Sequence, residues 1–181
     1  PGSEVGDVFT THSAIDAVSF TGSSATGQHV YDAATNDGKR IQTEMGGKNP
    51  TVVSRSADLE TAADIVASGA FGVTGQACTA TSRAIVHEDQ YEAFVDAVVE
   101  RAEAIDIGPG LDGADMGPQV SPGELESTLE YIDIAHDEGA TLETGGGQPD
   151  IDDGYFVEPT VFAGVDSEMT IAQEEVFGPV L

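Results

Sequence analysis

The pattern that most limits the fold of this chain is an alternation of short apolar segments with longer amphipathic ones, separated by glycine-rich turns. Segment 14–21 (AIDAVSFT) predicts a short strand, and the apolar spacing over 28–38 predicts a helix after it. The alternation returns later, with a strand predicted over 82–88 and a strongly amphipathic helix over 89–105. Strands that alternate with helices indicate an α/β fold.

A further helix is predicted over 58–72 (DLETAADIVASGAFG). Asp58 is the expected N-cap, because its carboxylate can accept a hydrogen bond from a free N–H of the first turn. We expect the apolar side of this helix to carry Ile65, Val66 and Ala70.

The charge of the chain is extreme, with 33 acidic residues against 6 basic ones and a formal net charge of −27. Such a chain is repelled by nucleic-acid phosphates and anionic membranes, so we expect neither as a partner. Two interpretations of the acidity stay open. One is an acidic surface that binds cations or a basic partner. The other, which we favour because the acids lie between apolar positions of predicted helices, is solubility in concentrated salt.

Membrane insertion and export have no support in the sequence. No apolar run approaches the roughly 20 residues that span a bilayer, and no signal peptide is visible, so we expect a cytoplasmic protein. The single cysteine, Cys78, forms no intrachain disulfide, which fits a reducing compartment. It also excludes a multi-cysteine zinc or iron–sulfur site within this chain, and no metal site is expected. On composition alone, Cys78 is either an inert core residue or a nucleophile.

Three local patterns are candidates for chemistry. The stretch from Gly22 to Gly27 (GSSATG) lies between a predicted strand and a predicted helix, whose first N–H groups suit a phosphate. Its glycine spacing is loose, and an ordinary strand-to-helix turn explains it equally well. Glu44 stands just before two adjacent glycines, and Cys78 follows Gly-Gln-Ala.

Taken in order, the segments FTGSSATG, EMGGKNP, GQACTATSR, MGPQVS, YFVEPTVF and QEEVFGPV resemble motifs of the NAD(P)-dependent aldehyde dehydrogenase superfamily. The resemblance implies an aldehyde dehydrogenase-like α/β fold. Residues 1–46 would be the C-terminal part of a Rossmann-type NAD(P)-binding domain, and residues 47–181 an incomplete catalytic domain. Chains of the family are longer, so we expect a piece of a larger protein that is inactive by itself.

The resemblance also implies a role for each matching residue. Cys78 would be the nucleophile that forms a thiohemiacetal and then a thioester, and Glu44 the base that activates water. The residues implied for cofactor binding are Gly22, Ser23 and Gly27 in the glycine loop, Met45 and Gly46 near the nicotinamide, Glu175 at its ribose, and Phe177 beside its ring. The sequence does not separate NAD from NADP.

We therefore expect an enzyme that oxidises a small aldehyde to a carboxylic acid. The ACTATSR context resembles the branch that handles α-ketoglutarate semialdehyde. One alternative is transfer of the acyl group to coenzyme A, against which Glu44 argues because such relatives commonly lack this base. The other is an acidic, non-catalytic binding module. The resemblance implies a homo-oligomer, a dimer or a tetramer.

Overall fold

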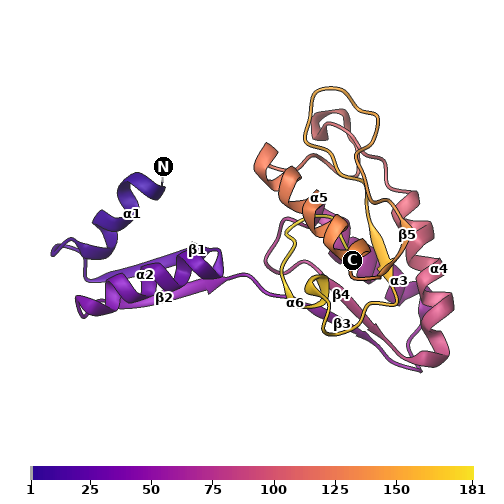
Figure 1. Cartoon of the computed structure of the whole chain (residues 1–181), viewed down its shortest axis with the longest axis horizontal. Coiled ribbons are helices and arrows are strands. Elements are labelled where there is room, and N and C mark those ends of the chain that lie inside the picture. Colours follow the sequence, from indigo (N-terminus) through magenta and orange to yellow (C-terminus); the bar gives the residue numbers. More distant parts are fainter. Residues whose placement is uncertain (1) are drawn as a thin grey trace. The chain divides into compact units, whose positions relative to one another are not determined.

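The computed structural model describes residues 2–181, apart from the side chain of Ser3, and divides into two compact units, Pro1–Gly46 and Gly47–Leu181 (Figure 1). Both units combine helices with short parallel strands, as expected for an α/β chain. The functions assigned to residues 1–46 and 47–181 stay predictions. None of the helices in the described residues is long and apolar enough to cross a membrane.

The first unit is built on a strand–helix–strand crossover. Its elements are α1 (Gly2–Thr11), β1 (Ala17–Gly22), α2 (Ser24–Asn36) and β2 (Arg40–Met45). Strands β1 and β2 pair in parallel, with Val18 opposite Ile41, and α2 is the crossover that such pairing requires. Helix α2 lies against both strands and buries Val30 and Ala34 (Figure 1). The predicted strand and helix are thus confirmed, whereas nothing in the sequence analysis anticipated α1.

The second unit repeats the crossover with a larger core. Its main elements are β3 (Pro50–Val53), α3 (Leu59–Phe71), β4 (Arg83–Val86), α4 (Tyr91–Glu103), α5 (Pro122–Asp137), β5 (Thr141–Thr144), β6 (Val161–Ala163) and α6 (Thr170–Gln173). Strands β3 and β4 pair in parallel with α3 between them, and β5 pairs antiparallel with β6. One core joins Val53 to Val66 and Phe71 of α3 and to Phe94 and Val98 of α4.

Helix α3 confirms one detail of the sequence analysis and corrects another. The side chain of Asp58 accepts a hydrogen bond from the N–H of Thr61 at 2.9 Å, as predicted for an N-cap. Ile65, however, is 58% exposed, so its placement on the apolar side is wrong. The buried stripe follows the spacing i, i+3, i+4, i+7, i+8 through Ala63, Val66, Ala67, Ala70 and Phe71, and Ile65 falls outside it.

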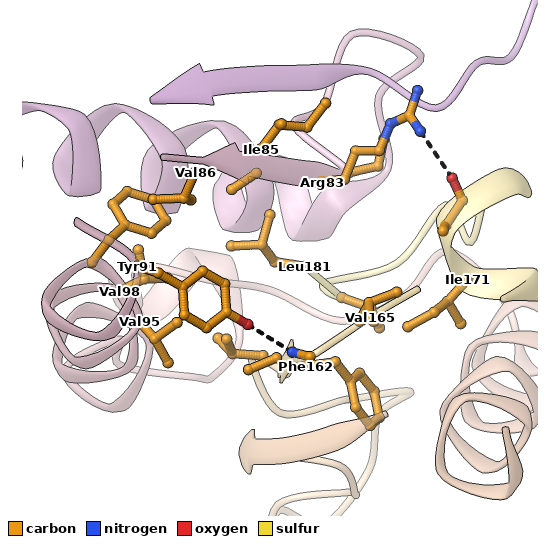
Figure 2. A pocket seen from close by; sticks show the side chains of 18 of the residues that line it. Arg83, Ile85, Val86, Tyr91, Val95, Val98, Phe162, Val165, Ile171 and Leu181 are labelled. Carbon is orange, nitrogen blue, oxygen red and sulfur yellow. Dashed lines mark hydrogen bonds between the residues drawn. The ribbon is translucent and has the colours of Figure 1, made fainter. Parts of the chain in front are cut away.

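A cavity of about 350 Å³ lies in the second unit, with walls from β4, α4 and the segment around β6 (Figure 2). Most of its lining is aliphatic or aromatic. Two hydrogen bonds cross its margin: the N–H of Gly164 donates to the hydroxyl of Tyr91 at 2.7 Å, and Nη1 of Arg83 donates to the carbonyl of Ala172 at 3.3 Å. Ile85, which also lines it, is 50% exposed, so the residues that the structure describes leave part of the apolar surface of β4 uncovered.

Candidate active site

Cys78 lies in the loop that connects α3 to β4, and its thiol is exposed. The loop leaves α3 through three successive residues in the left-handed region, Val73 at φ 53°, Thr74 at φ 58° and Gly75 at φ 68°. For a β-branched residue this conformation costs on the order of 1–3 kcal/mol, so surrounding contacts must impose it. Such strain is concentrated at functional sites.

The loop after residue 116 supplies contacts that hold this strained segment. Thr74 is buried, and its hydroxyl donates to the carbonyl of Gly117 at 3.1 Å. The side-chain amide of Gln76 donates to the carbonyl of Pro118 at 3.3 Å and accepts from the N–H of Val120 at 2.8 Å. The MGPQVS and GQAC motifs are therefore joined by hydrogen bonds, and the chain just before Cys78 is fixed from outside its own loop.

Asn49 holds the loop from the other side. Its Nδ2 donates to the carbonyl of Cys78 at 2.7 Å and to the carbonyl of Ala80 at 3.0 Å. Asn49 directly precedes β3, and its backbone N–H donates to the hydroxyl of Ser82 at 2.9 Å. The register of β3 against β4 thus places the side-chain amide of Asn49 next to the cysteine loop.

Glu175 and Phe177 lie on the segment after α6, beside the cysteine loop. A narrow cleft is lined by both residues together with Gly47, Asn49, Gly75, Ala77, Ala80, Thr81 and Ser82. Phe177 itself has φ 56°, another left-handed residue that is not glycine. A Cβ on Gly75 would lie 2.1 Å from the carbonyl oxygen of Gly178, so only glycine permits this close approach. The second unit therefore brings Cys78, Glu175 and Phe177 into one neighbourhood.

The other predicted site residues lie in the first unit, around the carboxyl ends of β1 and β2. Gly22 ends β1, and a Cβ there would lie 2.6 Å from the ring of Phe20. A Cβ on Gly27 would lie 2.5 Å from Sδ of Met45. A side chain at either position would therefore have to displace the end of Phe20 or Met45, which favours glycine at both positions.

Ser23 caps α2, because its hydroxyl accepts from the N–H of Thr26 at 3.3 Å. The start of this 13-residue helix, with its free N–H groups, thus lies directly after β1. Glu44 is exposed on β2, opposite Thr21, and its Oε1 accepts from Nε2 of Gln42 at 3.2 Å. Gly46 is the last residue of the unit. Glu44 and Cys78 thus belong to different units.

Comparison with known proteins identifies the chain. The model of the aldehyde dehydrogenase family matches residues 1–181. The chain belongs to this family. An α-ketoglutarate semialdehyde dehydrogenase of Haloferax volcanii is 63% identical over 184 residues, and a 2,5-dioxopentanoate dehydrogenase of Saccharolobus solfataricus is 47% identical over 186 residues. These alignments cover 100% and 99% of this chain but 38% of each relative, so the chain spans well under half of their length.

The fold agrees with this family. A crystal structure of betaine aldehyde dehydrogenase from Staphylococcus aureus, in complex with NAD+, matches with a TM-score of 0.97 and 43% sequence identity. The match covers 100% of this chain and 37% of that chain. The predicted aldehyde dehydrogenase-like α/β fold is therefore confirmed.

Within this family fold, three polar residues of the site escaped the sequence analysis: Asn49, Thr74 and Gln76. Each lies in or beside a recognised motif, but its partner is 29 to 44 residues away in the sequence. The available signal was a set of uncharged polar residues within two positions of a glycine, in segments that are not amphipathic helices. This pattern does not indicate which distant residue each of these side chains contacts.

Burial changes the pKa of Lys48, the residue directly before Asn49. Its pKa is lowered from 10.5 to about 8, first by desolvation on burial and second by the charge of Arg83, while the carboxylate of Glu175 opposes the shift. The folded protein therefore releases this proton at a lower pH than the unfolded chain does. Between about pH 8 and 10.5 the unfolded chain binds more protons, so the contribution of Lys48 to stability rises with pH in this window.

We therefore expect the destabilising effect of charged Lys48 to be complete below about pH 8 and to fade toward pH 10.5. Lys48→Met removes the titration while keeping an unbranched side chain. The free energy of unfolding of the full-length variant, relative to the parent, should fall as the pH rises through this window. Chemical unfolding at pH 7 and pH 10 measures it, and a difference that does not change with pH contradicts the prediction.

Proposed function

We propose that the full-length protein oxidises an aldehyde to the free carboxylic acid with NAD(P)+, through a thioester on Cys78. The observation that carries the proposal is an exposed Cys78 on a loop that begins with strained residues, is held by hydrogen bonds on both sides, and lines one cleft with Glu175 and Phe177 through its residues Ala77 and Ala80. The 63% identical relative is named for α-ketoglutarate semialdehyde, which makes this the first substrate to test. Assembly of the full-length protein into a homo-oligomer stays a prediction.

The residues proposed to bind the cofactor include positions in each unit. The free N–H groups at the start of α2, with Gly22, Ser23 and Gly27 around them, fit a diphosphate, because small residues leave the backbone accessible. Met45 is 42% exposed and Glu175 is half-buried, and they are proposed to contact the nicotinamide and its ribose, with Phe177 beside the ring. NAD+ in the Staphylococcus aureus relative supports this choice of cofactor.

Chemistry begins at the sulfur of Cys78. Its thiolate adds to the carbonyl carbon of the aldehyde, the C–S bond forms, and the π electrons move to oxygen, near the backbone N–H of Cys78. When bound, the nicotinamide cofactor accepts the hydride that this adduct releases, and a thioester to Cys78 remains. Sulfur suits both the addition to the aldehyde and the later cleavage of the thioester, because it is a soft nucleophile and a good leaving group.

Release of the product needs water, and this is the role proposed for Glu44. Its carboxylate takes a proton from a water molecule as the oxygen attacks the thioester carbon. The C–S bond then breaks, the electron pair returns to sulfur, and the carboxylic acid leaves. An acyl-enzyme without this base would persist until another acceptor, such as coenzyme A, reached it.

The test follows reduced cofactor and product from α-ketoglutarate semialdehyde in concentrated salt. For full-length Glu44→Gln we expect one equivalent of reduced cofactor per site, then turnover lowered by about 10²–10⁴-fold, because an amide does not deprotonate water. Mass spectrometry should show the acyl-enzyme. Glu143→Gln, the same change at an exposed residue of β5, is the control and should behave like the parent. Unchanged turnover in Glu44→Gln, or an acyl-coenzyme A product from the parent, overturns the hydrolytic proposal.

A further inference from the structure

We propose that Asn49 is a positioning residue for the nucleophile: it fixes the backbone on the carboxyl side of Cys78 and thereby sets the direction of the thiol. The inference rests on the proposed role of Cys78. Neither the recognised motifs nor the comparisons give Asn49 a role in the reaction.

The contacts of the Asn49 side chain are directed at the cysteine turn. A carboxamide has two N–H donors, and Nδ2 of Asn49 uses both, at 2.7 Å to the carbonyl of Cys78 and at 3.0 Å to the carbonyl of Ala80. The N–H of Ala80 donates to the carbonyl of Ala77 at 2.9 Å, which closes a turn around Cys78. One side chain thus holds two carbonyl groups of the turn that carries the sulfur.

The backbone of Asn49 is held in place as well. Its N–H donates to the hydroxyl of Ser82 at 2.9 Å, and its carbonyl accepts from the N–H of Ser82 at 3.1 Å and from the N–H of Arg83 at 3.3 Å. These bonds continue into the parallel pairing of Pro50 with Arg83. The amide is therefore presented from the end of a sheet, which is the rigid kind of support that a catalytic group needs.

The consequence for Cys78 follows from backbone geometry. The N–H of Ala80 holds the carbonyl of Ala77, in the peptide plane before Cys78, and Asn49 holds the carbonyl of Cys78, in the plane after it. With both planes held, the φ and ψ angles of Cys78 are determined, and so is the direction of its Cα–Cβ bond. A displacement of the reacting sulfur by about 1 Å costs on the order of 10²-fold in rate.

The experiment compares full-length Asn49→Asp and Asn49→Ala with the parent. Aspartate keeps the shape, but its carboxylate has no donor and faces two carbonyl oxygens, so we expect kcat to fall by about 10²-fold at neutral pH. The KM for the cofactor should change less than about twofold, because Asn49 is not proposed to bind it. As the pH falls toward about 5, a carboxyl group among carbonyl oxygens gains a proton and regains one donor.

We therefore expect the deficit of Asn49→Asp relative to the parent to shrink at low pH, whereas that of Asn49→Ala stays constant. A side chain that only fills space, without donating hydrogen bonds, does not produce this difference. The control is Asn36→Asp, the same change at the other asparagine of the chain. Asn36 is exposed at the end of α2, so this variant should match the parent at every pH. Unchanged kcat in both Asn49 variants, or a pH-independent loss in Asn49→Asp, overturns the inference.

A second readout separates this inference from the proposed function. Hydrogen exchange of the peptide that spans 77–82, measured without substrate, reports the turn directly. Exchange should be at least about tenfold faster in Asn49→Ala than in the parent, because the turn loses both carbonyl bonds. If the parent shows no turnover, the proposed function fails while this result still decides whether Asn49 orders the turn. Equal exchange in parent and variant counts against the inference whatever the activity.

Discussion

Replacing Cys78 with serine in the full-length protein is expected to lower the formation of reduced cofactor by at least about 10⁴-fold, the scale seen when an enzyme loses its nucleophile. The substitution exchanges one atom on an exposed side chain, so the fold has little reason to change. A serine hydroxyl stays protonated near neutral pH, adds poorly to a carbonyl, and is a worse leaving group from an ester than a thiolate from a thioester. Spectrophotometry of reduced cofactor measures the loss.

Two further measurements distinguish lost chemistry from lost structure. Cofactor affinity and the unfolding midpoint of Cys78→Ser should match the parent, because the residues proposed to bind the cofactor are unchanged. Mass spectrometry after incubation with aldehyde should find an acyl-enzyme in the parent and none in the variant. Turnover of Cys78→Ser at the parental rate would mean that Cys78 is an exposed thiol without a chemical role, and the non-catalytic alternative would then gain support.

Elements governed by local rules were predictable from the sequence. Asp58 was recognised as an N-cap because its partner, the N–H of Thr61, is three residues away, and the glycine turn before α2 was recognised from the strand and helix patterns around it. The exposure of Ile65 was not predictable, because the helical period admits two neighbouring apolar stripes. The side on which α4 packs decides between them.

The geometry of the candidate site was not predictable, for a different physical reason. Val73 and Thr74 are unfavourable residues for left-handed backbone, and a rule based on propensity excludes the conformation that the structure shows. The compensation comes from the 117–120 loop, more than 40 residues further along the chain. Likewise, the contact between Asn49 and Cys78 depends on the register of β3 against β4, which periodicity does not specify. Motifs located the residues, and tertiary contacts oriented them.

Gly75→Ala should have the largest effect on stability, because two penalties fall on one methyl group. At φ 68°, alanine is strained by about 1–2 kcal/mol, and its Cβ would lie 2.1 Å from the carbonyl oxygen of Gly178, a backbone atom that no side-chain rotation moves away. We expect a loss of about 2–4 kcal/mol in the free energy of unfolding, since overpacking of this kind adds to the strain.

The same substitution three residues earlier provides the control for Gly75→Ala. Gly72 has φ −56°, and a Cβ there meets nothing within 4 Å, so Gly72→Ala should change stability by no more than about 0.5 kcal/mol. Chemical unfolding of both full-length variants in concentrated salt measures the contrast. Because relief of the clash must move Gly178 away from the cysteine loop, Gly75→Ala should also weaken cofactor binding through Glu175 and Phe177, whereas Gly72→Ala should not. Equal stability and equal affinity in the two variants would show that the cysteine loop does not depend on this close approach.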